Sequence, residues 1–474
     1  LLDIDLGGPK PAALVADVIT RLALDDVETD DVLLLSLRFR NGNLGGALEL
    51  RDLSLPFALE FGEAESDSTS SDDLTFEGLI FENMTFEKKV VFSNVSWSDE
   101  VFIDRSTFEQ GLSIKYSTLT SPDDKDPRKI LINKSFIEHD FHLLHLTVKG
   151  KLLLYDNTIS PAFQIEDSSM RHGTILRDND FADFMIHGGT NYSITGINLN
   201  NVDRFELKNS WFAEIQIGQN NISSELVIDD VTWDREFELT ANTIGEEFYF
   251  KPKHVGYSAK NGSVINLVAN SVGGVASIAI PANDLDLRPI HVDLSSSSFQ
   301  GRLNVGLTPP FDMVDEAATS EANAREERYC YYETRPSKGL TVDLSSATAK
   351  RFAWNLPFGD CSYRWFGSGF RYDEWLGDPR KHEIVSPYKS VDDLKNWQYQ
   401  ISDAQPSALI FMSDYLRAQG RFTASRSALF DAKRMDYEPH ARCETMQLWQ
   451  IRFWTELWTP RTFPKNWPPE RRER

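Results

Sequence analysis

The sequence predicts a mainly β protein: a right-handed parallel β-helix, or solenoid, with an N-terminal helical cap and a C-terminal α-helical hairpin. Three observations support this fold class. A pattern of about eleven residues recurs along most of the chain, hydrophobic residues alternate within each copy, and helical periodicity is confined to the two ends. Repetition of this kind is expected when each coil of the chain is the template for the next.

The repeat is clearest in two consecutive stretches, VVFSNVSWSDE and VFIDRSTFEQG, which span residues 90–111. Short alternating runs broken by Asn, Asp, Ser and Gly are typical of strands. One copy cannot bury its own hydrophobic side, whereas stacked copies can, and two copies would make a coil of roughly 22 residues. The expected inward ladders contain Phe81, Phe92, Ile103 and Ile114, and also Phe86, Trp97, Phe108 and Leu119. An antiparallel β-sandwich is the alternative, but it gives no reason for repetition residue by residue.

The chain divides into four predicted segments. Residues 1–30 form a capping helix, because hydrophobic residues recur there at helical spacing, at Leu14, Val15, Val18, Ile19 and Leu22. Residues 31–352 form the β-solenoid with insertions, and residues 353–404 form an aromatic-rich cap built from loops. Residues 405–474 form a helical hairpin, broken at Gly420, and then a basic and aromatic tail.

The charge is strongly negative and unevenly distributed. A formal net charge of −23 excludes a general nucleic-acid-binding surface, so no direct binding to nucleic acid is expected. Residues 406–474 carry 12 Lys and Arg against 8 Asp and Glu, so the acidic excess lies before them. Three cysteines, Cys330, Cys361 and Cys443, make no disulfide framework and indicate a reducing compartment. Export is the alternative, because six N-x-[ST] triplets begin at Asn83, Asn94, Asn133, Asn191, Asn221 and Asn261.

Two C-terminal stretches, GFRYDEWLGD and QPSALIFMSDYLRAQGRFTASRSALFDAKR, carry a family resemblance together with the repeats. The chain resembles bacterial pentapeptide-repeat-like β-solenoid proteins, many of which bear the automatic name "membrane-associated oxidoreductase". The resemblance implies a cytoplasmic solenoid tethered to a membrane. It implies no redox cofactor, because the sequence has neither a G-x-G-x-x-G after a strand nor a C-x-x-C. The matching positions are Gly369, Tyr372, Trp375, Gln405, Pro406, Leu416, Arg417, Gly420, Ala424 and Arg426.

The sequence predicts no metal, cofactor or catalytic site, although several groups of residues were candidates. Along a strand, His139 and His145 point to one face and His142 to the other, so the three do not converge as zinc requires. Three aspartates in RDNDFAD lack the Gly and bidentate Glu of a calcium loop; they are Asp178, Asp180 and Asp183. The remaining candidates are too many, or too far from a histidine, to single out; they are Asp229, Asp230, Asp234, Glu236, Asp360, Cys361 and Arg364.

The tail supplies the predicted interface residues, in which tryptophan and phenylalanine alternate with cations as at a membrane surface. They are Trp449, Arg452, Phe453, Trp454, Trp458, Arg461, Lys465 and Trp467. The predicted function is a non-enzymatic scaffold or sensor at the cytoplasmic face of a membrane. It would bind a membrane protein, another protein partner or a second copy through the C-terminal helices. The alternatives are a polysaccharide lyase or hydrolase on a β-helix, and an acidic decoy that mimics DNA.

Overall fold

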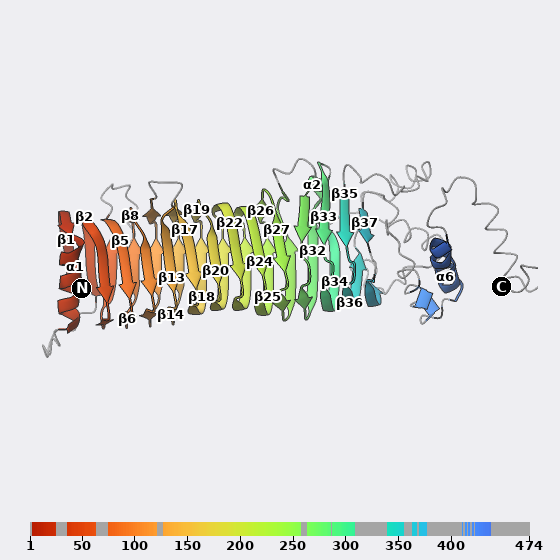
Figure 1. Ribbon diagram of the computed structural model, residues 1–474, viewed down its shortest axis with the longest axis horizontal. Coiled ribbons are helices and arrows are strands. Elements are labelled where there is room, and N and C mark those ends of the chain that lie inside the picture. The colour runs from red at the N-terminus through yellow and green to blue at the C-terminus, as the bar shows by residue number, and fades with distance from the viewer. Residues whose placement is uncertain are drawn as a thin grey trace, which may run out of the picture. The chain divides into compact units, whose positions relative to one another are not determined.

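The protein is mainly β, and its strands pair in parallel into one 38-stranded sheet. The computed structural model describes residues 2–24, 36–62, 74–120, 127–256, 263–285, 287–308, 339–354, 363–366, 369–376 and 422–437, with isolated residues between 410 and 420. All pairings between these strands are parallel, so the antiparallel sandwich is wrong. Within residues 1–404 the strands lie side by side in long rows (Figure 1).

The first row of paired strands, series A, is made of longer strands. Its members are β2 (Ser36–Arg51), β5 (Leu74–Glu82), β9 (Val101–Asp104), β13 (Lys129–Asn133), β17 (Lys151–Tyr155), β20 (Thr174–Arg177), β22 (Thr190–Asn198), β24 (Trp211–Gly218), β27 (Phe237–Thr240), β30 (Ser263–Asn266), β33 (Pro289–Asp293), β35 (Gly339–Asp343) and β37 (Tyr363–Phe366).

A second row of longer strands, series B, follows β1 (Leu2–Pro11) and the first part of β2. Its members are β4 (Ala58–Gly62), β7 (Val90–Ser93), β11 (Leu112–Lys115), β15 (Phe141–Leu144), β18 (Thr158–Glu166), β21 (Asp180–His187), β23 (Asn201–Lys208), β25 (Asn221–Asp229), β29 (Glu247–Lys251), β32 (Val275–Pro281), β34 (Ser298–Thr308), β36 (Thr348–Trp354) and β38 (Arg371–Leu376).

Two rows of very short strands connect the longer ones. Series C contains β3 (Ser54–Leu55), β6 (Thr85–Phe86), β10 (Thr107–Phe108), β14 (Phe136–Ile137), β28 (Thr243–Ile244) and β31 (Ser271–Val272), and it continues through the first residues of β18, β21, β23, β25, β34, β36 and β38. Series D contains β8 (Val95–Trp97), β12 (Thr118–Leu119), β16 (Thr147–Val148), β19 (Ser169–Met170) and β26 (Thr232–Trp233), together with the first residues of β5, β22 and β24.

The register explains why the sequence reads as an eleven-residue repeat. Phe92 pairs with Ile114 in series B, and Phe81 pairs with Ile103 in series A. Successive copies therefore contribute alternately to the two long rows, and each residue stacks on the one two copies away. The predicted ladder residues are all buried, with at most 1% of their surface exposed; they are Phe81, Phe86, Phe92, Trp97, Ile103, Phe108, Ile114 and Leu119.

Left-handed backbone residues set the end of each copy. Asn83, Asn94, Arg105 and Tyr116 fall eleven residues apart and have φ values between 48° and 56°. The same conformation recurs at His145, Asp156, Asp167 and Asp178. Asn and Asp tolerate this conformation better than other residues with a side chain, which is why the copies end in Asn- and Asp-rich turns.

A ladder of buried asparagines follows these turns along part of the chain. Each side-chain amide donates to the carbonyl oxygen of the next, at Nδ2–Oδ1 distances of 2.9 to 3.0 Å. The asparagine ladder consists of Asn157, Asn179, Asn200, Asn220, Asn242 and Asn270, each no more than 2% exposed. Every rung satisfies a polar group that the neighbouring rung buries, so the ladder fixes the register between copies.

The N-terminal segment is only partly as predicted. Helix α1 (Ala12–Leu24) packs on β2 and buries Ala12, Val15 and Ile19, in agreement with an amphipathic cap. Leu14 is 52% exposed, however, and the ten residues before the helix form strand β1, which pairs with β2. The expectation of a helix over the whole segment is wrong there, because β2 offers an open edge that β1 extends.

The later segments show two further departures. The predicted loop-built cap contributes strands β37 and β38, which pair with β35 and β36, and residues 377–404 of that segment lie outside the described ranges. A short helix, α2 (Ala282–Leu285), lies in the connection between β32 and β33. Residues 405–474 form a separate unit that contains α6 (Phe422–Tyr437). Within that unit Gly420 has φ of 74°, and the Ser413 and Ser425 hydroxyls are 3.0 Å apart.

Candidate functional site

The predicted interface residues of the tail lie outside the part of the chain that the structure describes. They are Trp449, Arg452, Phe453, Trp454, Trp458, Arg461, Lys465 and Trp467, all within residues 438–474. Their role stays a prediction. Among the described helices, none is both long and hydrophobic enough to cross a bilayer.

The three histidines considered as zinc ligands do not come together. His142 faces outward from β15, and burial lowers its pKa, an effect that nearby Asp140 partly offsets. His145 occupies a left-handed turn and stacks on Tyr116 at a ring distance of 4.8 Å. His139 is exposed between β14 and β15. The three therefore serve local contacts.

The aspartates considered for calcium also remain apart. Asp178 forms an ion pair with Arg177 at 3.1 Å, whereas Asp180 accepts a hydrogen bond from Asn201 at 2.6 Å. Asp180 and Asp203 line a shallow groove over the first residues of β18, β21, β23 and β25. No lysine or arginine lines this groove, so it lacks the cation that a polysaccharide lyase site would need beside its carboxylates.

The other carboxylate candidates are likewise not assembled into a site. A hydrogen bond from Lys251 to Asp229, 3.2 Å long, raises the pKa of that lysine. Asp230 holds a left-handed turn, and Glu236 is exposed beside half-buried Asp234. Asp360 and Cys361 lie outside the described residues, and of Arg364 only its backbone position in β37 is described.

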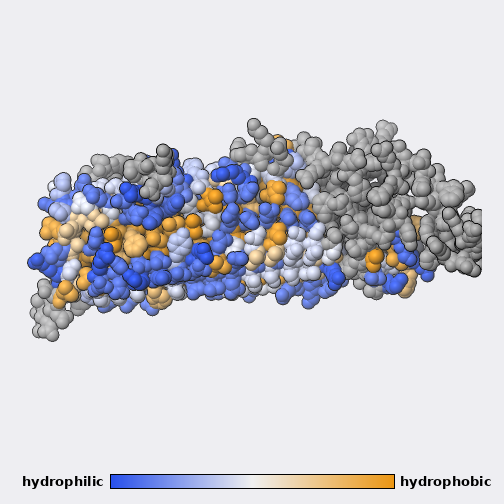
Figure 2. All heavy atoms as spheres, in the orientation of Figure 1, coloured by the Kyte–Doolittle hydropathy of each residue, from blue (hydrophilic) through white to orange (hydrophobic). Residues whose placement is uncertain are grey.

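A row of hydrophobic side chains faces outward from series A. It consists of Ile80, Phe102, Leu131, Leu153 and Ile175, which we call the outward row. These five residues are direct register partners on consecutive strands, and each lies between two buried residues of the core. Ile175 is 38% exposed and the other four are partly exposed. Hydrophobic surface gathers over the strands between β5 and β20 (Figure 2).

Polar residues line both margins of the outward row and one of its ends, and a glycine lies at the other end. Glu49 pairs with Ile80 at one end, and Gly196 pairs with Ile175 at the other. One margin carries Glu100, Lys129 and Lys151. The opposite margin carries Glu82, Asp104, Asn133, Tyr155 and Arg177. A line of hydrophobic side chains with a polar rim is the usual composition of a protein–protein interface.

A charged cluster centres on Glu206, which faces outward from β23 in series B. Its side chain is only 4% exposed and lies 2.5 Å from Lys208, 2.9 Å from His187 and 3.0 Å from Arg204. Burial alone would raise the pKa of Glu206, but the Lys208 hydrogen bond and the interactions with Lys208, His187 and Arg204 outweigh burial and lower the pKa. The partners of Glu206 are all side chains of this cluster, and we interpret the cluster as structural.

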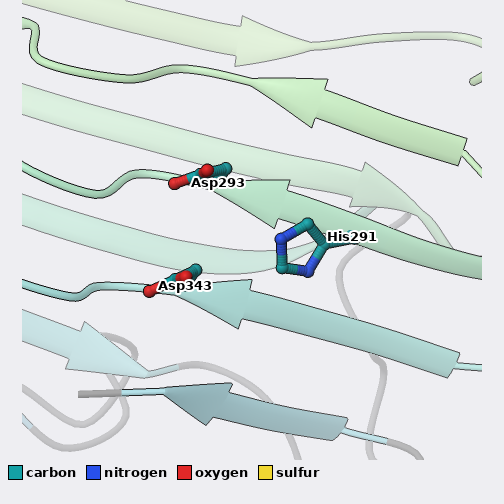
Figure 3. A group of neighbouring side chains, drawn as sticks. All are labelled: His291, Asp293 and Asp343. Carbon is teal, nitrogen blue, oxygen red and sulfur yellow. The ribbon is translucent and has the colours of Figure 1, made fainter. Parts of the chain in front are cut away.

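A second cluster has the composition of a metal centre. His291 and Asp293 lie on β33, and Asp343 lies on the paired strand β35 (Figure 3). One ligand atom from each residue lies within 4.8 Å of the other two, and all three side chains are partly buried. Among the residues that the structure describes, no other three His, Cys, Asp or Glu side chains converge in this way.

Sequence reasoning missed the outward row and the His291, Asp293 and Asp343 cluster, although the sequence carries a signal for each. Strands such as Val101-Phe102-Ile103 and Ile130-Leu131-Ile132 are hydrophobic without a break, which is typical of strands covered on both faces. The copies PIHVDLSSS and GLTVDLSSA align Asp293 with Asp343.

Comparison with family models, curated protein sequences and solved structures finds no match for this chain.

Proposed function

We propose that the chain is a non-enzymatic scaffold, wound as a right-handed β-solenoid, whose outward row docks against a second copy of the same chain. The observation that carries this proposal is the in-register hydrophobic row Ile80, Phe102, Leu131, Leu153 and Ile175. Five adjacent strands spaced about 4.8 Å apart give a flat hydrophobic strip about 19 Å long. Such a strip is stabilised when another surface removes it from water.

A second copy supplies a matching surface, because the outward row is close to symmetric about its centre. In the proposed arrangement a two-fold axis runs parallel to the strands and passes beside Leu131. Ile80 of one copy then lies opposite Ile175 of the other, and Phe102 lies opposite Leu153. The two stacks run in opposite directions, and the contact is isologous, which closes the assembly at two copies.

The polar margins complement each other in this arrangement. The same axis brings Glu100 opposite Lys151 of the second copy, and Glu82 opposite Arg177. It also brings the two Lys129 side chains opposite each other, each beside Glu100 of its own chain. Complementary charges at the rim favour this register over others and suppress non-specific hydrophobic association. Lys151 forms no ion pair within the described part of its own chain, so it is available for such a contact.

The test is the mass of the purified full-length chain at micromolar concentration, measured by sedimentation equilibrium. We expect a dimer for the natural sequence and a monomer for Leu131→Lys, because the substitution places a charge on each side of the axis. Val275→Lys is the matched control, since Val275 is a 36% exposed hydrophobic residue in series B. It should remain dimeric. A monomeric natural chain, or a dimeric Leu131→Lys variant, would overturn the proposal.

A charge reversal tests the register. Lys151→Glu should weaken the dimer, and Glu100→Lys should do the same, whereas the double variant should recover most of the lost affinity. The internal Glu100–Lys129 pair has Nζ–Oε1 of 3.6 Å and side chains 36% and 41% exposed, so its loss costs little. Equal weakening in the single and double variants would contradict the two-fold arrangement.

Association with a membrane or membrane protein, at the cytoplasmic face, belongs to the same proposal. Its support is the tail, in which residues such as Trp454 and Arg461 combine interfacial aromatics with cations. A dimer would present two tails, and two weak membrane anchors bind more tightly than one. The polysaccharide-enzyme and DNA-decoy alternatives have no comparable support among the described residues.

A further inference from the structure

The parallel register of β33 and β35 creates the His291, Asp293 and Asp343 cluster. Asp293 pairs directly with Asp343, and His291 precedes Asp293 by two residues, so all three side chains leave the same face. Figure 3 shows the two carboxylates on neighbouring strands with the imidazole beside them. The backbone therefore fixes the relative positions of one nitrogen and two oxygen ligands.

Each carboxylate is oriented by its own turn. One oxygen of Asp293 accepts a hydrogen bond from the Ser295 amide at 2.8 Å, and one oxygen of Asp343 accepts from the Ser345 amide at 2.8 Å. In both side chains this contact uses Oδ1. The second oxygen of each carboxylate is therefore held in place while keeping the capacity to bind a cation.

The two carboxylates also repel each other. Like charges directly opposite on adjacent strands are destabilising. Neither Asp293 nor Asp343 forms an ion pair with a lysine or arginine in the described part of the chain. A cation bound between the two carboxylates would attract both of them and remove the repulsion. This electrostatic argument for a bound cation is independent of the distances between the ligand atoms.

We propose that His291, Asp293 and Asp343 bind one divalent first-row transition-metal ion, with water completing its coordination. The imidazole nitrogen favours zinc and its neighbours over magnesium and calcium, which prefer oxygen ligands alone. The site is on the rigid strands rather than on a loop, so the metal would clamp two copies of the repeat together. This inference uses no part of the self-association surface.

The test is equilibrium dialysis of the full-length chain against ZnCl2, with MgCl2 as the hard-cation comparison. We expect one zinc ion per chain with affinity in the micromolar range, little magnesium binding, and at least a tenfold loss in Asp343→Asn. His291→Gln should behave in the same way. Asp140→Asn is the matched control, because Asp140 also lies 3.8 Å from a histidine, His142, but without a third ligand.

Two readouts keep the outcomes distinct. Thermal unfolding in the presence of a chelator shows whether the variants fold. Asp140→Asn and His291→Gln should match the natural chain there, and Asp343→Asn should match it or be slightly more stable, because one of the two repelling charges is gone. Added zinc should stabilise only the natural chain and Asp140→Asn. Unchanged zinc binding in Asp343→Asn, or binding lost equally in Asp140→Asn, would overturn the site and indicate adventitious zinc on surface groups. Dimer formation without zinc would be unaffected by either result.

Discussion

At the scale of single residues, Glu206 illustrates how this chain accommodates a buried charge. The carboxylate is nearly removed from water, which would normally favour its neutral form. A hydrogen bond from Lys208, together with Arg204 on the same strand and His187 on the neighbouring strand β21, reverses that preference. The outward position is therefore occupied by an ion cluster rather than by a hydrophobic side chain, and this part of series B is unsuited to docking.

Replacing Glu206 by Gln should destabilise the fold at neutral pH by about 1–3 kcal/mol, because Lys208 and Arg204 lose a charged acceptor. The folded-state pKa of Glu206 lies below its ordinary value of 4.5. Its contribution is therefore fully present above that pH and is lost as pH falls through the lower folded-state pKa. Urea unfolding measured from pH 7 down to about pH 3 should show the natural and variant curves converging below about pH 4.5.

Glu238→Gln provides the control for this measurement. Glu238 also faces outward from a long strand and is partly exposed, but it has no ion pair with any described residue. Its substitution should change the unfolding free energy by less than about 0.5 kcal/mol. A difference for Glu206→Gln that stays constant across the acid range would show that the effect is steric.

At the scale of elements, the asparagine ladder is the feature that joins successive copies at one turn. Asn200 donates to the Leu176 carbonyl at 3.2 Å and to Asn220, and its own oxygen accepts from both the amide and the side chain of Asn179. Its hydrogen bonds therefore span three successive coils. Because all these groups are buried, each has no water to replace a lost partner.

Asn200→Ala should lower the unfolding free energy by about 2–4 kcal/mol, because it leaves several buried polar groups without a partner. The neighbouring Asn201→Ala should cost less than about 0.5 kcal/mol, since Asn201 is exposed and its side chain makes a single bond to Asp180. Urea midpoints of the two variants provide the comparison. Equal costs at both positions would mean that the ladder contributes no more than an exposed hydrogen bond does.

Elements also show where sequence reasoning succeeds and where it stops. The pairing of Phe92 with Ile114 was predictable, because the hydrophobic period and the turn residues agree on the same spacing. Strand β1 was not, because Gly7, Gly8 and Pro9 are unfavourable inside a strand. The segment was expected to belong to the capping helix of residues 1–30, and only pairing with the open edge of β2 makes it a strand.

The two candidate sites were hidden for different physical reasons. In Val101-Phe102-Ile103 all three residues are hydrophobic, so the sequence does not say which of them faces outward; the register does. Asp293 and Asp343 occupy the same position in the copies HVDLSSSS and TVDLSSAT, so the sequence aligns them. Residues 309–338 separate the two copies in the sequence, however, and only the pairing of β33 with β35 shows that the two aspartates are direct neighbours.

At the scale of the whole sheet, each coil of two copies pairs only with the coils before and after it. The described strands pair with strands one coil earlier and one coil later, and the hydrophobic ladders follow the same connectivity. Stability in such an array is a sum of local terms between neighbours. Damage at one position should therefore spread by one or two coils and then stop, unless the rows unfold as a single cooperative unit.

Phe86→Ala tests this in full. Phe86 is fully buried and stacks on Phe108 at a ring distance of 4.7 Å, so its truncation should cost about 3–5 kcal/mol in the coils around β6 and β10. Hydrogen exchange should show amides of these strands losing protection while those of β25 and β29 keep it. Phe250→Ala, in β29, should have the opposite effect, with protection lost around β29 and kept in β6 and β10, because Phe250 packs on Trp233 and Phe237 further along the rows. If either variant lowered protection evenly from β6 to β29, the coils would unfold together, and neighbour contacts alone would not account for the stability of the array.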